Sequence, residues 1–251
     1  EISKEFMKIL QKQGINFHMQ TKVESIKKNK EGASILTVNK EGKKVNFECN
    51  VVLISVGRKS YTKNLNLDAA GVSLDNKKRI KTDKNFLTNI KNIYAIGDVI
   101  QGPMLAHKAE EEGIAVAENI AGQSGHVNYD IIPGVIYTSP EVAAIGKTEE
   151  QLNELNIKYK IGKFPFMANS RAKAIDESEG FVKILSDQTT DKVLGAHIIG
   201  NHAGEMIAEI AIAMEFGASS EDIARTCHAH PTFSEALKEA ALSVDKRAIH
   251  S

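Results

Sequence analysis

The sequence predicts an α/β protein whose C-terminal part is of the α+β type. Three patterns support this: a helix followed by alternating strands at the N-terminus, a continuous apolar run at 51–56, and strand patterns followed by helical ones beyond residue 130. At 251 residues, the chain is long enough for one large domain or two ordinary ones. Hydrophobic residues make up 42% of it and charged residues 25%, which is typical of a globular protein.

The first expected elements are a helix and a small sheet. Apolar residues recur at helical spacing and a glycine follows as a C-terminal cap: Ile2, Phe6, Ile9, Leu10 and Gly14. The next apolar residues alternate and predict one face of a strand: Ile15, Phe17, Met19, Thr21 and Val23. Turn signals at Glu31-Gly32 and Glu41-Gly42 predict that two more strands, 34–39 and 44–49, complete a meander.

The middle of the chain contains short apolar runs separated by polar segments. The run 51–56 ends in a Gly-Arg turn and predicts a buried strand that enters a loop. Residues 60–90 have no periodic pattern and predict a linking segment. A short buried strand at 93–96 is expected next, followed by a helix from Pro103 to Ala121, because proline is favoured at the first helical position.

Beyond Asp130 the pattern becomes that of a mixed or antiparallel sheet followed by helices. The expected strands are 135–138, 159–164, 181–185 and 193–199, and the expected helices are 204–216, 220–226 and 231–244. The first of these helices carries an apolar stripe of Met206, Ile207, Ile210, Ala211 and Met214. Such a stripe predicts a face that covers a sheet, and it is also a candidate for part of a subunit interface.

Charge and cysteine content exclude several classes of protein. Lys and Arg together number 32, as do Asp and Glu, and this balance disfavours binding to nucleic acid or to acidic membranes. No apolar run approaches the roughly 18 residues that cross a bilayer, and the first residues show no signal-peptide core. Cys49 and Cys227 form no CxxC or zinc-type spacing, so we expect neither a disulfide-rich fold nor a metal site.

The strongest chemical signal is the segment Cys227-His-Ala-His-Pro-Thr-Phe-Ser-Glu235. A histidine whose second ring nitrogen is held by a carboxylate makes a good general base, and His230 and Glu235 are spaced to form such a pair. An ordinary helix-capping pair is the structural alternative. A metal site built from Cys227, His228 and His230 is disfavoured because no carboxylate pair lies near them.

A second signal lies at 93–107. The strand expected at 93–96 runs into Gly97-Asp98, where a glycine lets a ligand approach the backbone and a carboxylate can accept a hydroxyl. The helix expected to begin at Pro103 directs free N–H groups and a positive dipole toward whatever precedes it. Together they predict a site for a ligand with an anionic or hydrogen-bond-accepting edge.

Three strings carry a resemblance to a known family: CHAHPTFSEA at 227–236, AIGDV at 95–99 and GPMLAHKAEEEG at 102–113. They resemble the C-terminal half of dihydrolipoamide dehydrogenases, a branch of the class I pyridine nucleotide-disulfide oxidoreductases. Further matches are EISKEFMKILQKQG at 1–14, VGRK at 56–59, YTSPEV at 137–142, ANSRAKA at 168–174 and GAHIIG at 195–200. Other flavin disulfide reductases, similar to glutathione or mercuric reductase, and a non-catalytic dimerisation module are the alternatives.

The resemblance implies an organisation and a set of site residues. Residues 1–59 would end an NAD-binding domain, 60–125 would return to an FAD-binding domain, and 126–251 would form the interface (dimerisation) domain. His230 resembles the catalytic acid/base and Glu235 the carboxylate that orients it. The positions that resemble FAD contacts are Asp98, Met104, Leu105, Ala106 and His107, and those that resemble NAD contacts are Val23 and Gly57. His228 is interpreted as structural, and Cys227 as a small buried hydrophobic residue.

The resemblance also implies a reaction and partners. The parent enzyme would oxidise protein-bound dihydrolipoamide to lipoamide, with NAD as acceptor, through FAD and a redox disulfide. It would act as a homodimer that serves lipoyl-bearing subunits of 2-oxoacid dehydrogenase complexes. The GxGxxG fingerprints and the CxxxxC disulfide of the family are absent, so we expect a C-terminal fragment that is inactive alone. A bacterial cytoplasm is the expected location, with the mitochondrial matrix as the alternative.

Overall fold

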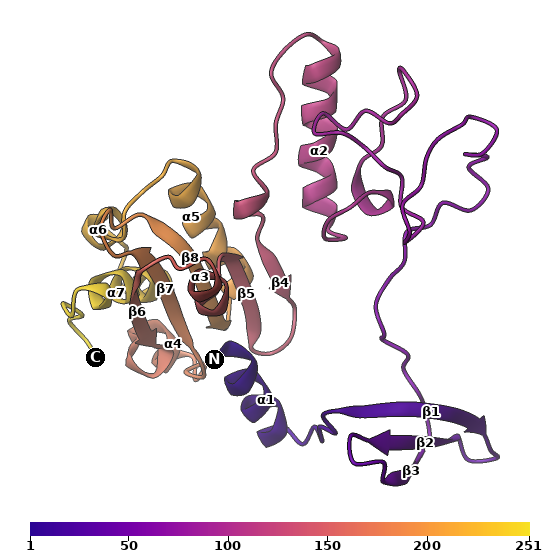
Figure 1. Cartoon of the computed structure of the whole chain (residues 1–251). Coiled ribbons are helices and arrows are strands. Elements are labelled where there is room, and N and C mark those ends of the chain that lie inside the picture. Colours follow the sequence, from indigo (N-terminus) through magenta and orange to yellow (C-terminus); the bar gives the residue numbers. More distant parts are fainter. The chain divides into compact units, whose positions relative to one another are not determined.

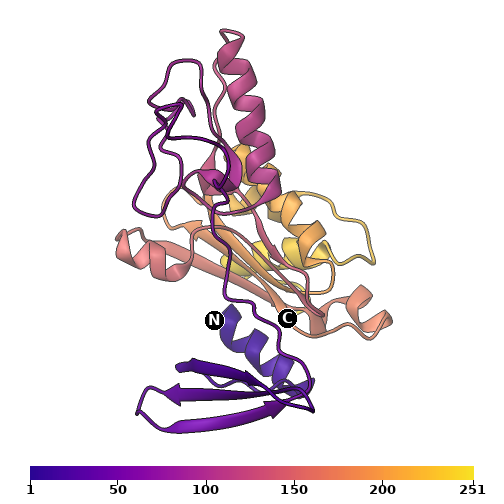
Figure 2. The same ribbon diagram turned by 90° about the vertical axis from the view of Figure 1, so that its right-hand side faces the viewer.

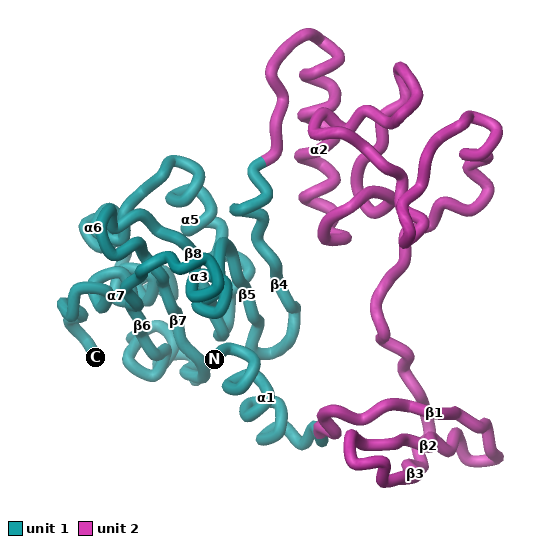
Figure 3. Tube along the Cα trace, viewed as in Figure 1, with its two compact units in different colours: residues 1–16, 128–251 teal, residues 17–127 magenta.

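The computed structural model describes all 251 residues, which form two compact units (Figure 3). Unit 1 contains residues 1–16 and 128–251, and unit 2 contains residues 17–127. No helix is both long enough and apolar enough to cross a membrane. Helices occur with antiparallel sheets in both units, in agreement with the fold class that the sequence predicts.

Unit 1 is built on a five-stranded antiparallel sheet with the order β4-β5-β8-β7-β6. The strands are β4 (Gly134–Ile136), β5 (Glu141–Gly146), β6 (Tyr159–Pro165), β7 (Phe181–Asp187) and β8 (Val193–Gly200). Strands β7 and β8 lie in the centre of the sheet and are almost continuously buried, since both of their faces are covered. Their side chains define the core on each side of the sheet.

The helices of unit 1 lie on both faces of this sheet (Figure 1). They are α1 (Ile2–Lys12), α3 (Glu149–Glu154), α4 (Ser170–Ala174), α5 (Ala203–Glu215), α6 (Ser220–Arg225) and α7 (Glu235–Val244). Ile198 packs with residues of α5 and α7, whereas its neighbour Ile199 packs with Ile9 of α1. Successive strand residues point to opposite faces, so α1 covers one face and α5 with α7 cover the other.

Unit 2 contains a three-stranded antiparallel sheet and the long helix α2 (Ala106–Ile120). The strands β1 (Thr21–Lys28), β2 (Ala33–Asn39) and β3 (Lys44–Cys49) are the indigo ribbons at the bottom of Figure 2. A separate apolar cluster packs the irregular segment 60–105 onto α2 and includes Val72, Ile80, Phe86, Ala95, Ile100 and Ala115. A short 3-10 turn, η1 (Gly97–Val99), lies at this cluster.

The prediction of a buried strand at 51–56 is wrong. The segment has no strand partner, and Val51, Leu53 and Val56 are more than four-fifths exposed. An apolar run is buried as a strand only when a neighbouring strand pairs with it, and the sheet in this chain ends at β1 and β3. The apolar composition of the segment therefore did not predict its structure, because a strand also needs a neighbour to pair with.

Several element boundaries also differ from prediction. The first strand begins at Thr21, not Ile15, because Gly14 and Gln20 adopt left-handed backbone conformations. The strand expected at 93–96 is reduced to a single bridge between Leu87 and Tyr94. Helix α2 begins at Ala106 and not at Pro103, since Leu105 is still extended.

The sheet and the α5 stripe account for most of the unit 1 core. Met206, Ile207, Ile210 and Met214 are buried against the sheet of their own unit, so these four are not available to a subunit interface. Strand β5 and the short helices α3 and α4, each five or six residues long, were not predicted from the sequence. Helix α7 begins at Glu235, four residues later than the sequence pattern predicted.

Candidate active site

The structure brings His230 and Glu235 together, as the sequence predicts. The His230 Nδ1 atom lies 2.9 Å from Glu235 Oε1, and the second carboxylate oxygen accepts the Thr232 N–H at 2.8 Å. Glu235 is the first residue of α7, although the helix expected from residue 231 would have placed it one turn further in, and the His230-Pro231 peptide is cis. The pair therefore lies on the loop that enters α7, with the carboxylate held by both the ring and the backbone.

The protonation of the pair follows from its contacts. Partial burial acts to raise the pKa of Glu235, but hydrogen bonds from Thr232 and His230 outweigh it, and the pKa lies below its ordinary value. Glu235 is therefore a carboxylate that can only accept, so His230 Nδ1 carries the proton. In the neutral tautomer with the proton on Nδ1, Nε2 is the accepting nitrogen. Nε2 has no hydrogen-bond partner, and the side chain is 64% exposed. This geometry leaves one ring nitrogen accessible, as the sequence-based prediction of a general base requires.

The loop that carries His230 is anchored by Thr232 and Asn169. The Thr232 hydroxyl donates to the Ala229 carbonyl at 2.7 Å, and the Thr232 carbonyl accepts from Asn169 Nδ2 at 2.9 Å. Asn169 is buried and its Oδ1 caps α4 by accepting the Ala172 N–H. The sequence analysis quoted Asn169 within a matching string but did not identify this contact, which joins segments 63 residues apart.

His228 is structural, as interpreted from the sequence, and Cys227 is not buried as expected. His228 Nε2 lies 2.6 Å from Glu209 Oε1 and Nδ1 lies 3.0 Å from the Thr226 carbonyl, so both ring nitrogens face acceptors. The Glu209 contact raises the pKa of His228 despite the opposing effect of burial. Neighbours in extended backbone point to opposite sides, and with His228 directed inward Cys227 is exposed.

We expect the His228–Glu209 pair to stabilise the fold at low pH and to lose this effect as pH rises. The folded-state pKa is raised above 6.5, so the contribution is complete below the unfolded value and is lost as pH passes through the folded value. Melting temperatures of wild type and His228→Gln between about pH 5 and pH 9 test this. The difference between them should shrink above pH 6.5. Burial lowers the pKa of His197, so its effect has the opposite sign. The difference in melting temperature between wild type and His197→Gln should shrink as the pH falls.

The second predicted site, in unit 2, is assembled around η1 and the start of α2. The Asp98 carboxylate lies 3.6 Å from the Arg58 guanidinium and is 48% exposed, while the Asp98 carbonyl accepts the Ser60 hydroxyl at 2.6 Å. The Arg58 guanidinium also donates to the Met104 carbonyl. Arg58 and Ser60 thus connect the turn at Asp98 with the segment before α2, a role that the sequence analysis did not assign to them.

The start of α2 fits a ligand with an accepting edge. Leu105 is the N-cap residue and makes no side-chain capping hydrogen bond, so Met104, Leu105, Ala106 and His107 form a helix start without a side-chain cap. Gly97 and Gly102 have positive φ angles of 71° and 125°, and their missing side chains let the backbone pack closely against Ala109 and Lys108 of α2. The uncapped helix start and the half-exposed Asp98 carboxylate offer hydrogen-bond donors and an acceptor near each other in the chain, which is the donor set that the resemblance to FAD-binding proteins leads us to expect.

The two predicted NAD positions are not brought together. Val23 lies at a bulge in β1 and is 52% exposed, so it is not a core valine. Gly57 has φ +100° and no atom within 4 Å of where its Cβ would be. No hydrogen bond or ion pair connects them.

No group of three or more His, Cys, Asp or Glu side chains could hold a metal ion.

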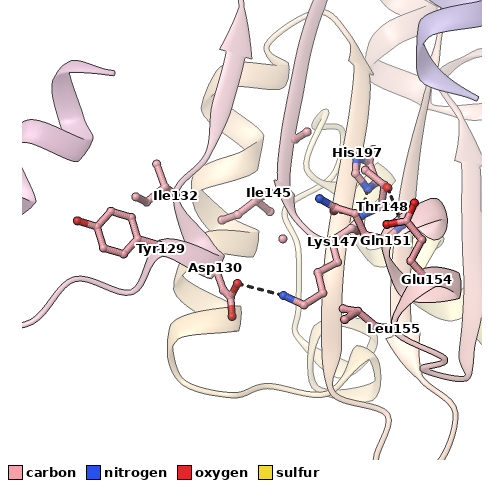
Figure 4. Close-up of a pocket in the computed structure, with 12 residues that line it drawn as sticks. Tyr129, Asp130, Ile132, Ile145, Lys147, Thr148, Gln151, Glu154, Leu155 and His197 are labelled. Atoms are coloured by element: carbon pink, nitrogen blue, oxygen red, sulfur yellow. Dashed lines mark hydrogen bonds and ion pairs between the residues drawn. The ribbon is translucent and has the colours of Figure 1, made fainter. Parts of the chain in front are cut away.

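A cavity of about 550 Å³ lies elsewhere in unit 1 (Figure 4). It is bounded by β5, the start of α3 and the segment before β4, and includes Asp130, Lys147 and His197. Lys147 forms an ion pair with Asp130 at 3.0 Å, and the buried His197 contacts the Lys147 carbonyl at 3.2 Å. None of the predicted site residues lines this cavity, so it is not part of the candidate active site.

Comparison with known proteins identifies the family. Residues 1–113 match the family model of pyridine nucleotide-disulphide oxidoreductases, and residues 132–241 match its dimerisation domain. The mitochondrial dihydrolipoyl dehydrogenase of Pisum sativum is 55% identical over 100% of this chain and 50% of its own length. Leghemoglobin reductase of Vigna unguiculata is 55% identical over 97% of this chain and 47% of its own length.

The fold matches that of solved structures such as the flavoprotein disulfide reductase RclA from Escherichia coli, with a TM-score of 0.84 at 25% identity over 94% of this chain and 54% of that one. The crystal structure of LpdA from Mycobacterium tuberculosis superposes with a TM-score of 0.84 at 24% identity, over 93% of this chain and 50% of that one. The chain spans about half the length of the curated relatives it matches. Members of the family are oxidoreductases that use FAD and NAD. The two family matches, the sequence identity and the fold show that this chain belongs to the pyridine nucleotide-disulphide oxidoreductase family and is similar to part of its dihydrolipoyl dehydrogenases.

Proposed function

We propose that the full-length protein is a dihydrolipoyl dehydrogenase, which oxidises protein-bound dihydrolipoamide to lipoamide with NAD as the final acceptor. The observation that carries this proposal is the His230–Glu235 contact of 2.9 Å with His230 Nε2 free to meet a reactant. The 55% identity to the Pisum sativum enzyme over the whole chain supports it. This chain would supply the acid/base pair, and other parts of the protein would supply the redox disulfide.

The role of the pair follows from the chemistry of thiols. A thiol has a pKa of about 8.5 and reacts as the thiolate, so a base that removes its proton increases the reactive fraction near neutral pH. His230 Nε2 would take that proton, and Glu235 would stabilise the resulting imidazolium through Nδ1. The same atom would return the proton in the reverse direction. A base of this kind contributes about 10²–10⁴-fold to rate.

Unit 2 would contribute to cofactor binding. Asp98 would accept a hydroxyl of the FAD ribityl chain, and the backbone N–H groups of Met104, Leu105, Ala106 and His107 would face the flavin ring. Bound FAD supplies the electron acceptor between the disulfide and NAD. Val23 and Gly57 would lie in the NAD site, where their exposure leaves room for a ligand. The segments 1–59, 60–125 and 126–251 would accordingly belong to the NAD, FAD and interface domains.

The full-length protein would act as a homodimer, in which His230 and Glu235 of one subunit serve the disulfide and flavin of the other. The match of residues 132–241 to a dimerisation domain and the exposure of the His230 ring support this arrangement. Its reaction partners would be the lipoyl-bearing subunits of 2-oxoacid dehydrogenase complexes. The mitochondrial names of similar proteins favour the mitochondrial matrix over the bacterial cytoplasm as its location.

Steady-state assays of two polypeptides test this proposal: the full-length protein and the chain of 251 residues. The full-length protein should reduce NAD with dihydrolipoamide, whereas the chain alone should not, because Cys49 and Cys227 are both free and lie in different units. Oxidised glutathione, mercuric ion and a ferric haem protein, each with NADH as the electron donor, are compared with lipoamide in the reverse direction. A full-length protein that prefers any of them to the dihydrolipoamide–lipoamide couple would contradict the assignment.

A further inference from the structure

Two fully buried charges in unit 2 have no part in the chemistry described above. Lys108 and Glu112 lie one turn apart on α2, both side chains are 0% exposed, and Lys108 Nζ lies 3.1 Å from Glu112 Oε1. Removing two charges from water is costly, and replacing such a pair by apolar side chains is often neutral or even stabilising. Stability alone therefore does not explain why this helix buries an ion pair.

The pair holds the backbone of Gly97 through both of its polar groups. Glu112 Oε2 accepts the Gly97 N–H at 2.7 Å, and Lys108 Nζ donates to the Gly97 carbonyl at 3.2 Å. Lys108 also lies against Gly102, where an added Cβ would be 3.3 Å from its Cε and Nζ. Lys108 therefore lies against both Gly97 and Gly102, the two glycines of the segment that precedes α2. Two apolar side chains could fill this space but could not hold the Gly97 peptide groups.

Gly97 directly precedes Asp98, whose own carbonyl is held by the Ser60 hydroxyl at 2.6 Å. The backbone is thus held on both sides of Asp98, while the Asp98 carboxylate remains 48% exposed and meets only Arg58, at 3.6 Å. A carboxylate presented from a held backbone loses little conformational freedom when it binds a hydroxyl. The buried pair is in this way connected to the exposed group that would contact FAD.

We propose that Lys108 and Glu112 are positioning residues for FAD. By holding Gly97 they set the place of the Asp98 carboxylate and of the turn that leads to the start of α2. Neither side chain touches the cofactor, since both are buried. This inference rests on the proposed function, because it assumes that FAD binds at Asp98.

Two variants of the full-length protein separate positioning from stability. In Lys108→Met/Glu112→Leu both charges are replaced by apolar side chains, and Gly97 loses both side-chain contacts, while its carbonyl still accepts the Ile100 N–H. The buried Gly97 N–H is left without an acceptor, so the apoprotein should lose about 1–3 kcal/mol of stability, less than an unpaired buried charge would cost. In Glu112→Gln an amide oxygen can still accept the Gly97 N–H, but Lys108 loses its counter-charge, so this apoprotein should be the less stable. The melting temperature of each apoprotein and its FAD dissociation constant, from quenching of flavin fluorescence, are then compared.

The expected result is that FAD affinity follows the Gly97 contacts and not the melting temperature. Affinity should fall at least about tenfold, or about 1.4 kcal/mol, in the double variant and stay within about threefold of wild type in Glu112→Gln. Affinities that fall in the same order as the melting temperatures would overturn the proposal. If the double variant does not fold, Glu112→Gln decides: affinity near wild type supports the proposal, and a tenfold loss overturns it.

A matched control is available in the same unit. Asp75 and Arg79 form an ion pair of the same sequence spacing at 2.7 Å, about one-fifth exposed, which does not contact Gly97. Asp75→Leu/Arg79→Met should leave the FAD dissociation constant unchanged, and an equal loss of affinity there would overturn the proposal. A wild-type protein that binds no FAD would overturn the proposed function itself, and this inference with it, before any variant is compared.

Discussion

His230→Gln should reduce the turnover of dihydrolipoamide by the full-length protein by about 10²–10⁴-fold, the range typical for loss of a general base. Glutamine approximates the size of the ring, and its amide can still donate to Glu235, but it offers no basic nitrogen where Nε2 stands. The remaining activity should rise with pH, because substrate thiols then ionise without assistance. The turnover rate and its pH profile are the measurements.

His228→Gln is the matched control for this prediction. His228 lies two residues away in the same segment, but its two nitrogens are occupied by Glu209 and the Thr226 carbonyl, so it has no lone pair to offer. Its variant should lower the melting temperature and leave turnover within a few-fold of wild type. Equal losses of turnover in the two variants would show that the segment as a whole, and not the His230 nitrogen, is required.

Gly162→Ala should destabilise unit 1 and disturb the active-site loop at the same time. An added Cβ on β6 would overlap the Ala240 carbonyl oxygen and lie 2.6 Å from Val244 Cγ2, so α7 would have to move away from the sheet. Overpacking of this kind costs about 1–3 kcal/mol, occasionally more. Because α7 begins at Glu235, its displacement should also lower turnover. Urea denaturation and the turnover rate measure the two effects.

Gly134→Ala is the corresponding control, since it places the same methyl group on β4 with no atom within 4 Å. Its free energy of unfolding should remain within about 0.5 kcal/mol of wild type, as for other surface substitutions. Similar losses of stability in both variants would mean that strand glycines matter here for backbone reasons and not for the close packing of α7 on β6.

Elements with strong local periodicity were predictable from the sequence. The spacing of Ile2, Phe6 and Ile9 predicted α1, and the alternating or continuous apolar patterns predicted β2, β3 and β6 to β8 within one or two residues. The His230–Glu235 pair was also predictable, because the two residues are only five apart and a helix start brings them together. In each case the information lies within a short stretch of chain.

Burial and pairing over long separations were decided by the tertiary structure. The segment 51–56 has the composition of a buried strand but is exposed, since no strand lies beside it. Conversely, Lys108 and Glu112 belong to a run of charged residues typical of a solvated helix face, yet both are fully buried against Gly97.

The contacts of the active-site segment with distant residues were likewise decided by the tertiary structure. Glu209 contacts His228, 19 residues away in the sequence, and Asn169 contacts Thr232, 63 residues away. No local sequence pattern predicts either contact. Hydrophobic periodicity records which face of an element turns inward, because that face repeats along the chain. Which atoms meet it there depends on how distant elements pack, and only the folded structure determines that.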